Sequence, residues 1–135
     1  MIVVDTNVIV SLYLPGPQSG EVQRLLREHP DWAAPALWRS EMINVLCTYM
    51  RVRGLTLPQS LEIFELADEL LSSNTFTMSP LKVLEVSNRT GCSGYDSEFV
   101  CLAEELQTQL LTYDAGLISK ASSVGCKPLD FMQAG

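Results

Sequence analysis

Four acidic residues are distributed along the chain at positions that could together bind a divalent metal ion. Asp5 and Asp114 each follow a short apolar run, whereas Glu41 and Asp96 lie in segments with helical patterns. Carboxylate oxygens are the ligands that Mg²⁺ and Mn²⁺ prefer. Such ions activate water and neutralise developing charge, which suits the hydrolysis of phosphodiester bonds. The four acids therefore indicate a metal-assisted hydrolytic site.

Each acid also has an ordinary structural explanation. Asp5 and Asp114 stand where a side chain can cap a following helix. Asp96 completes the capping-box pattern that begins at Ser93, and the helix dipole favours an acid there. Glu41 lies only ~40° from the apolar face of its helix, which also suits a solvated rim position. The case for a shared site thus depends on all four acids converging.

The apolar patterns predict strands that alternate with helices. Strands are predicted at Met1–Asp5, Asn74–Met78, Gln109–Thr112 and Lys127–Phe131, and Trp32–Ala34 is either a short strand or a packed connector. Helices are predicted at Ser19–Glu28, Pro35–Arg53, Leu57–Ser72, Pro80–Thr90, Ser93–Gln107 and Ala115–Ser123. This alternation predicts an α/β fold with a mainly parallel sheet, whose functional groups gather beyond the carboxyl ends of the strands. Asp5 and Asp114 are therefore expected at one edge of the sheet.

Proline and glycine mark the predicted ends of the longest helix. Pro35 suits a first helical turn, where a missing N–H leaves no hydrogen bond unmade, and Gly54 suits the position just beyond the last turn. Between them the apolar side chains form a stripe that places Glu41 at its edge. We therefore expect this helix to run from Pro35 to Arg53.

Length and composition fit one compact domain spanning residues 1–135. The chain has 135 residues, of which 47% are hydrophobic. No apolar run reaches the ~18 residues that a membrane-spanning helix needs, and the first residues lack the basic segment of a signal peptide. We therefore expect a cytoplasmic protein without a membrane segment.

The cysteines and the histidine do not form a zinc-binding pattern. The chain has four cysteines and one histidine, and no two cysteines form a C-x-x-C pair. Zinc sites need clustered cysteine and histidine ligands, so a zinc centre is disfavoured. The cysteines are interpreted as scattered thiols in a reducing compartment.

The net charge of −7, from 9 basic and 16 acidic residues, argues against broad nucleic-acid binding by surface charge alone. Two bound divalent cations would offset part of this charge, and local basic side chains must supply the rest. The basic residues that could contact a nucleic acid are Arg39, Arg51, Arg53, Lys82, Arg89 and Lys120.

These motifs resemble those of the PIN-domain family, and within it the VapC-type toxins of toxin–antitoxin systems. The matching segments are Asp5-Thr6-Asn7 after the first strand, Glu41 on its helix, Tyr95–Ala103, and Leu110–Leu117. Each motif alone is weak evidence for a family, but the order of the four acids and the distances between them along the sequence are fairly specific. The resemblance covers essentially the whole chain.

The resemblance implies a three-layer α/β/α sandwich and an endoribonuclease that depends on Mg²⁺ or Mn²⁺. It also implies an RNA substrate, a homodimer and a protein antitoxin as partner. The implied acidic quartet is Asp5, Glu41, Asp96 and Asp114, supported by Thr6, Asn7 and Thr112. We expect the three aspartates to be the direct metal ligands. Glu41 is expected to bind a second ion, position water or act from the outer shell.

Two alternatives remain at this stage. A haloacid-dehalogenase-type phosphatase also begins with an aspartate after a strand, but it carries a second aspartate where this chain has Asn7. The chain could instead be a catalytically silent PIN-like interaction module, although all four acids are present. The helices Pro35–Arg53 and Leu57–Ser72 are unusually apolar, which suits a dimer face, an antitoxin groove or ordinary core packing.

Overall fold

The computed structural model describes residues 1–122 and 128–130 of the chain. Within them, five strands form one sheet in the order β3-β2-β1-β4-β5, and every neighbouring pair is parallel. The strands are β1 (Ile2–Val4), β2 (Trp32–Pro35), β3 (Thr75–Phe76), β4 (Leu110–Thr112) and β5 (Pro128–Asp130). All residues of β1, β2 and β4 are buried, as expected for parallel strands covered on both faces. The predicted parallel sheet is confirmed.

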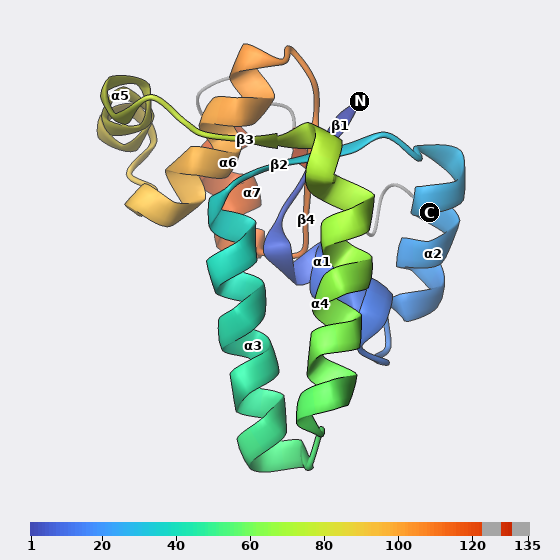
Figure 1. The fold of residues 1–135 in the computed structure, drawn as a ribbon. Helices are drawn as coiled ribbons and strands as arrows, with labels where there is room; N and C mark the ends of the chain where they lie inside the picture. The colour runs from blue at the N-terminus through green and yellow to red at the C-terminus, as the bar shows by residue number, and fades with distance from the viewer. Residues whose placement is uncertain (123–127, 131–135) are drawn as a thin grey trace.

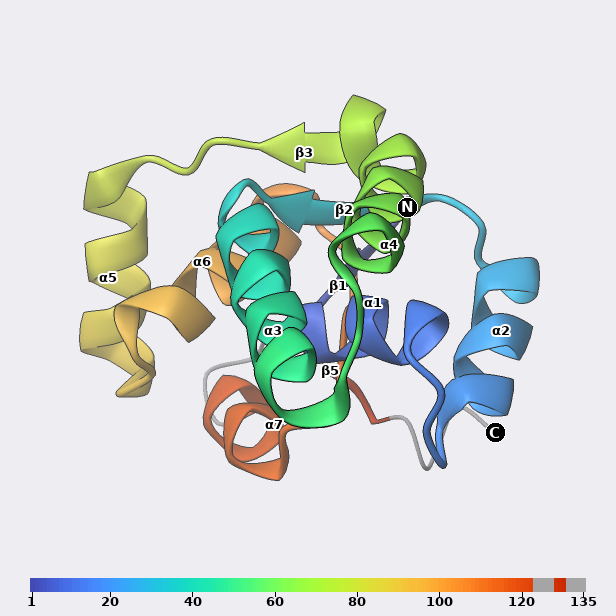
Figure 2. The ribbon, with the colours of Figure 1, turned by 60° about the horizontal axis from the view of Figure 1, so that its bottom comes forward.

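Helices cover both faces of this sheet (Figure 1; Figure 2). They are α1 (Thr6–Tyr13), α2 (Ser19–Glu28), α3 (Leu37–Arg53), α4 (Leu57–Leu71), α5 (Pro80–Thr90), α6 (Gly94–Glu105) and α7 (Ala115–Ser122), with a short 3₁₀ turn at Ser72–Asn74. The first four lie on one face, where α1 contacts β4 and α4 contacts β2. On the other face α6 contacts β1, β2 and β4, and α5 packs against α6. The α/β/α sandwich is thus confirmed.

The longest helix begins later than predicted. Pro35 is the last residue of β2, where it pairs with Phe76, and α3 starts at Leu37. Ala36 donates its backbone N–H to the Phe76 carbonyl at 2.8 Å, so the hydrogen bonding between β2 and β3 continues one residue beyond Pro35. The prediction of Pro35 in a first helical turn is therefore wrong. Gly54 does end the helix as predicted, with a φ of 72° that favours glycine.

Helix α1 was absent from the prediction. Its sequence, TNVIVSLY, is rich in β-branched residues that favour strands. The helix forms because Asp5 caps its first turn and its buried residues, Val8 and Ile9 among them, pack into the core. Tertiary packing thus overrides local preference here.

The other elements agree with prediction to within a few residues. The bounds of α2 and α5 are as predicted, Trp32–Ala34 is part of strand β2, and the strand predicted at Asn74–Met78 is limited to β3. Helix α6 is one residue shorter at its start, where Ser93 is the cap, and two shorter at its end. Ser123, Lys127 and Phe131, at the ends of predicted elements, lie outside the described residues.

Helices α3 and α4 form an antiparallel hairpin that extends away from the sheet (Figure 1). Its base is anchored by Trp38, which is fully buried and stacks on Phe64 with ring centroids 5.7 Å apart. The turn is closed by a capping box between Thr56 and Gln59. Among the described residues, no helix has both the length and the apolar character needed to cross a bilayer.

Candidate active site

The sheet topology creates a crevice where β1 and β4 lie side by side. The chain leaves β1 towards β2 through α1 and α2, whereas it leaves β4 in the opposite direction, towards β5, through α7. Parallel sheets bind ligands beyond the carboxyl ends of their strands at such a switch point. The residues that follow β1 and β4 are Asp5 and Tyr113-Asp114. Both predicted strand-end acids therefore reach the edge where a ligand is expected.

The sheet register places Asp5 beside Thr112. Val4 pairs with Leu111, and the Asp5 N–H donates to the Leu111 carbonyl at 2.9 Å. The Thr112 hydroxyl donates to Asp5 Oδ2 at 2.8 Å. Thr112 is fully buried and Asp5 is 8% exposed, so this bond is shielded from water. Thr112 therefore fixes the orientation of the Asp5 carboxylate.

The start of α1 holds the same carboxylate from the other side. The Thr6 backbone N–H donates to Asp5 Oδ1 at 2.7 Å, which is the cap of α1, and Asn7 Nδ2 donates to Oδ2 at 3.4 Å. Asn7 also reaches Thr112 Oγ1 at 3.5 Å. Asp5 thus is a helix cap, and this role leaves it facing the crevice.

Helix α3 brings Glu41 to the crevice because it packs against α1. The Thr6 hydroxyl donates to Glu41 Oε1 at 2.7 Å, so one threonine contacts both Asp5 and Glu41. Glu41 is partly buried. It is therefore held by a specific partner and is not a solvated rim residue.

Asp96 and Asp114 enter the crevice from the starts of α6 and α7. The Asp96 backbone N–H donates to Ser93 Oγ at 3.1 Å, which caps α6 without using the Asp96 carboxylate. Asp114 caps α7, since its Oδ1 accepts from the N–H groups of Gly116 at 2.9 Å and Leu117 at 3.1 Å. The predicted side-chain cap at Asp114 is confirmed. The predicted capping box at the start of α6 is only half formed, because Ser93 accepts from the Asp96 N–H but the Asp96 carboxylate does not bond back to Ser93.

All four acids line one open cavity of about 450 Å³. Its lining also includes Thr6 and Asn7, together with Val10, Ser11, Val45 and Tyr113. Among the described residues, however, no three acidic, histidine or cysteine side chains are close enough to form a ready-made metal cage. The four acids therefore line a shared cavity, but their carboxylates are farther apart than the ligands of a bound metal ion.

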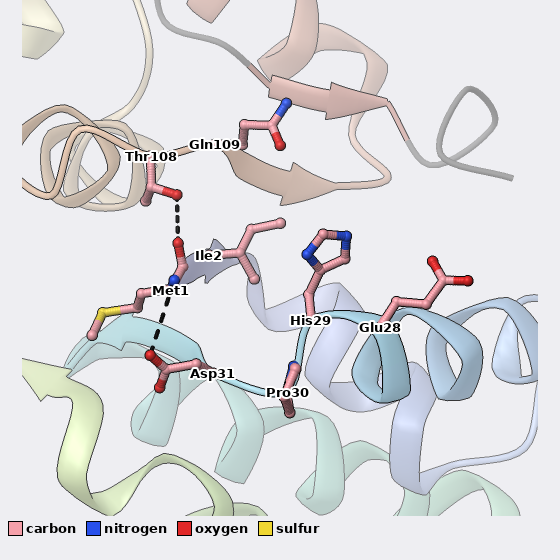
Figure 3. A pocket seen from close by; sticks show the side chains of 8 residues that line it. All are labelled: Met1, Ile2, Glu28, His29, Pro30, Asp31, Thr108 and Gln109. Atoms are coloured by element: carbon pink, nitrogen blue, oxygen red, sulfur yellow. Dashed lines mark hydrogen bonds and ion pairs between the residues drawn. The ribbon is translucent and has the colours of Figure 1, made fainter.

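A second cavity, at the opposite edge of the sheet, contains the histidine (Figure 3). It measures about 240 Å³ and lies between His29 and the amino ends of β1 and β4. There the N-terminal amine lies 3.9 Å from Asp31, and Thr108 donates to the Met1 carbonyl. His29 is thus remote from the acidic cleft, whose described lining includes neither histidine nor cysteine.

The carboxylates of the cleft perturb one another. Burial raises the pKa of Asp5 to about 6, and the nearby charges of Asp96 and Glu41 act in the same direction. Burial, followed by the charge of Asp96, raises the pKa of Glu41. Burial, followed by the charge of Asp114, raises the pKa of Asp96. Partly desolvated carboxylates that raise one another's pKa across a shared cavity fit a hard divalent cation, which would relieve their repulsion.

Two charged residues near the cleft were not assigned to it from the sequence. Burial raises the pKa of Glu98, and the charge of Glu41 adds to this effect. The charge of Lys120 partly offsets the raised pKa of Asp96, and Lys120 donates to the Gly91 carbonyl at 3.4 Å. Glu98 lies within the segment that carries the family resemblance, and Lys120 was one of six general candidates for nucleic-acid contact. No local pattern placed either of them beside the acids.

Three of those basic candidates are ion-paired with acids outside the cleft. Their pairs are Arg39 with Asp68, Lys82 with Glu105 at 2.8 Å, and Arg89 with Glu104 at 2.8 Å. Arg53 lies over the ring of Tyr49 on the hairpin. Lys120 is thus the candidate whose charge acts on a quartet member.

The fold and cleft together define an α/β protein with an acidic candidate cation site at the switch point of a parallel sheet. The family model described as PIN domain matches residues 2–122. The chain belongs to the PIN-domain family.

Solved structures with this fold cover nearly the whole chain. FitAcB from Neisseria gonorrhoeae matches with a TM-score of 0.72 at 16% identity, over 98% of this chain and 99% of that chain. VapBC-1 from nontypeable Haemophilus influenzae matches with a TM-score of 0.68 at 19% identity, over 98% and 99%. A toxin–antitoxin complex from Klebsiella pneumoniae matches with a TM-score of 0.66 at 14% identity, over 88% and 91%. No curated protein sequence matches significantly.

Proposed function

We propose that this chain is a metal-dependent endoribonuclease that acts as the toxin of a toxin–antitoxin pair. The observation that carries the proposal is the convergence of four acids, from the ends of two strands and from two helices, on one cavity. Membership of the PIN-domain family and similarity to a toxin–antitoxin complex support it. Such a toxin acts in the cytoplasm, where its RNA substrate is.

Asp5, Asp96 and Asp114 are the residues that would hold Mg²⁺ or Mn²⁺. A bound ion would supply charge neutralisation at the phosphate and a more acidic water. Thr112 and Thr6 keep the Asp5 carboxylate in place through bonds of 2.8 and 2.7 Å. Glu41, held by Thr6, has a raised pKa that makes it a better proton acceptor near neutral pH than an ordinary glutamate. We assign Glu41 to orienting or deprotonating the attacking water.

Cleavage by the purified chain tests this assignment. We expect a labelled single-stranded RNA to be cut in the presence of Mg²⁺ or Mn²⁺, and cutting to stop when EDTA is added. Readdition of Mg²⁺ beyond the EDTA concentration should restore it. Zn²⁺ should support less activity, because the cleft offers carboxylate oxygens without histidine or cysteine. Undiminished cleavage in EDTA would show that the acids do not act through a metal.

The α3–α4 hairpin is the surface that we assign to the antitoxin. It exposes large apolar side chains, each 46–69% accessible: Ile43, Val52, Leu57, Leu61 and Leu66. An amphipathic helix of an antitoxin could cover such a face. We propose that the chain without antitoxin is a homodimer.

Expression in bacteria, with and without the protein encoded beside it, tests the toxin role. We expect the chain alone to arrest growth and the pair to restore it and to purify together. Leu61→Glu, on the hairpin, should weaken the complex at least tenfold, whereas Leu84→Glu, on α5 and even more exposed, should not. Light scattering should give twice the chain mass without antitoxin. Normal growth under strong expression of an RNA-cleaving chain would exclude the toxin role.

A further inference from the structure

A smaller cavity adjoins the acidic cleft. It measures about 220 Å³ and is lined by Leu37, Ser40, Glu41, Asn44 and Tyr95. Because Glu41 lines both cavities, the two share a wall. The smaller one falls below the roughly 300–1,000 Å³ of pockets for drug-sized ligands, which suits a single flat ring system.

Tyr95 forms one side of this cavity from the first turn of α6, directly before Asp96. It is 65% exposed, and it is the one aromatic residue among the strongly exposed large hydrophobic residues that the structure describes. An exposed tyrosine presents a rigid apolar ring at small cost in conformational entropy. Its position beside a candidate catalytic acid makes it suitable for contacting a substrate.

Helix α3 forms the opposite side with residues that share one face. Leu37, Glu41 and Asn44 follow one another at helical spacing, with Ser40 beside them. Leu37 is apolar, whereas the Ser40 hydroxyl and the Asn44 amide both donate and accept hydrogen bonds. An aromatic ring facing polar edge groups matches a nucleobase, which has apolar faces and a hydrogen-bonding rim.

We propose that this cavity is a nucleobase subsite of the nuclease. One unstacked base of single-stranded RNA stacks on Tyr95, and its polar edge contacts Ser40 and Asn44. The inference rests on the proposed ribonuclease function and specifies its substrate, since a base within a duplex cannot reach such a pocket. The base belongs to a nucleotide that flanks the cleaved bond, because the cavity adjoins the acidic cleft.

The charge around the cavity favours a base over a phosphate. Glu41, an acidic residue, lines the cavity itself, and none of its four other lining residues carries a positive charge. A phosphate would be repelled there, whereas a neutral base would not. Base–aromatic stacking also provides affinity that does not depend on basic side chains, which are outnumbered by acidic ones in this chain of net charge −7.

RNA affinity, measured in a chain whose cleavage is strongly slowed, tests the subsite. In an Asp5→Asn background with Mg²⁺, a fluorescein-labelled single-stranded RNA of mixed sequence is titrated and its anisotropy followed. Adding Tyr95→Ala should weaken binding by about five- to one-hundred-fold, the range of one base–aromatic stack. Tyr95→Phe, which keeps the ring, should stay within about twofold. Leu84→Ala, which changes an exposed apolar residue of α5 away from both cavities, is the control and should change nothing.

Cleavage by chains with an intact Asp5 provides the second readout. Asn44→Ala should broaden the base preference at one position next to the cut, in RNA ends mapped after digestion. Equal RNA affinity of the chains with Tyr95 and with Tyr95→Ala would overturn the proposed base subsite but would not contradict the proposed nuclease function. A loss of dimer mass in Tyr95→Ala without a loss of RNA affinity would overturn it too, since Tyr95 would then contact a second copy. A wild-type chain that neither binds nor cuts RNA would overturn the nuclease itself.

Discussion

Asp5→Asn is expected to lower metal-dependent RNA cleavage by about 100- to 1,000-fold. The substitution keeps the shape of the side chain but removes the most buried charge of the cleft. Charge stabilisation by a bound metal contributes several kcal/mol to such reactions, and each 1.36 kcal/mol corresponds to a factor of ten in rate. Loss of one ligand charge should therefore lower the cleavage rate by two to three factors of ten. The rate is measured as the initial rate at saturating Mg²⁺.

The matched control for Asp5→Asn is Glu62→Gln. Glu62 is an exposed acid of α4, so its substitution changes the net charge equally without touching the cleft. It should leave the rate within about twofold. Thermal unfolding of both variants shows whether each is folded. Wild-type rates in a folded Asp5→Asn chain would exclude the cleft as the catalytic site.

The overall architecture could be predicted from the sequence because its strands and helices carry strong, separate signals. Short β-branched and apolar runs such as Ile2–Val4 are typical of buried parallel strands, and Gly54 and Gly91 end helices with the positive φ that glycine adopts readily. Helix α1 escaped prediction because its stability comes from the Asp5 cap and from core packing, which are not visible in local preference.

The grouping of the acids was predictable in outline, but their partners were not. Strand ends in a parallel sheet meet at one edge, which brings Asp5 near Asp114. The bond from Thr6 to Glu41, by contrast, depends on how α3 crosses α1, and the influence of Lys120 on Asp96 depends on the packing of α7. Such tertiary contacts join residues 24 to 35 positions apart, and no sequence period indicates them.

An acidic chain can still bind RNA, which is also negatively charged, if the affinity comes from a bound cation and from base stacking and not from basic side chains. At least four of the nine basic side chains, those of Arg24, Arg39, Lys82 and Arg89, are paired with acids outside the cleft, so general attraction of a phosphate backbone is weak. A cation in the cleft would reverse the local charge where the phosphate must lie. Stacking on Tyr95 would add affinity that is independent of charge. RNA binding by this chain should therefore depend strongly on divalent metal.

Acidification is expected to stabilise the metal-free protein. Burial and neighbouring carboxylates raise the pKa of Asp5 from 3.8 to about 6 in the folded state. The folded chain therefore binds a proton more tightly than the unfolded chain, and this group's contribution to stability falls as pH rises from about 4 to above 6. The difference is worth up to about 3 kcal/mol. The raised pKa values of Glu41 and Asp96 act in the same direction.

The free energy of unfolding in EDTA should therefore be lower at pH 7.5 than at pH 5.5, in urea titrations at constant ionic strength. Adding Mg²⁺ at pH 7.5 should restore stability, by about 2.7 kcal/mol at one hundred times its dissociation constant. Asp5→Asn should flatten the pH dependence and weaken the response to Mg²⁺, because it removes the charge from which both arise. Glu62→Gln should retain both. A metal-free chain that is more stable at pH 7.5 than at pH 5.5 would mean that the cleft carboxylates do not repel one another enough to recruit a cation.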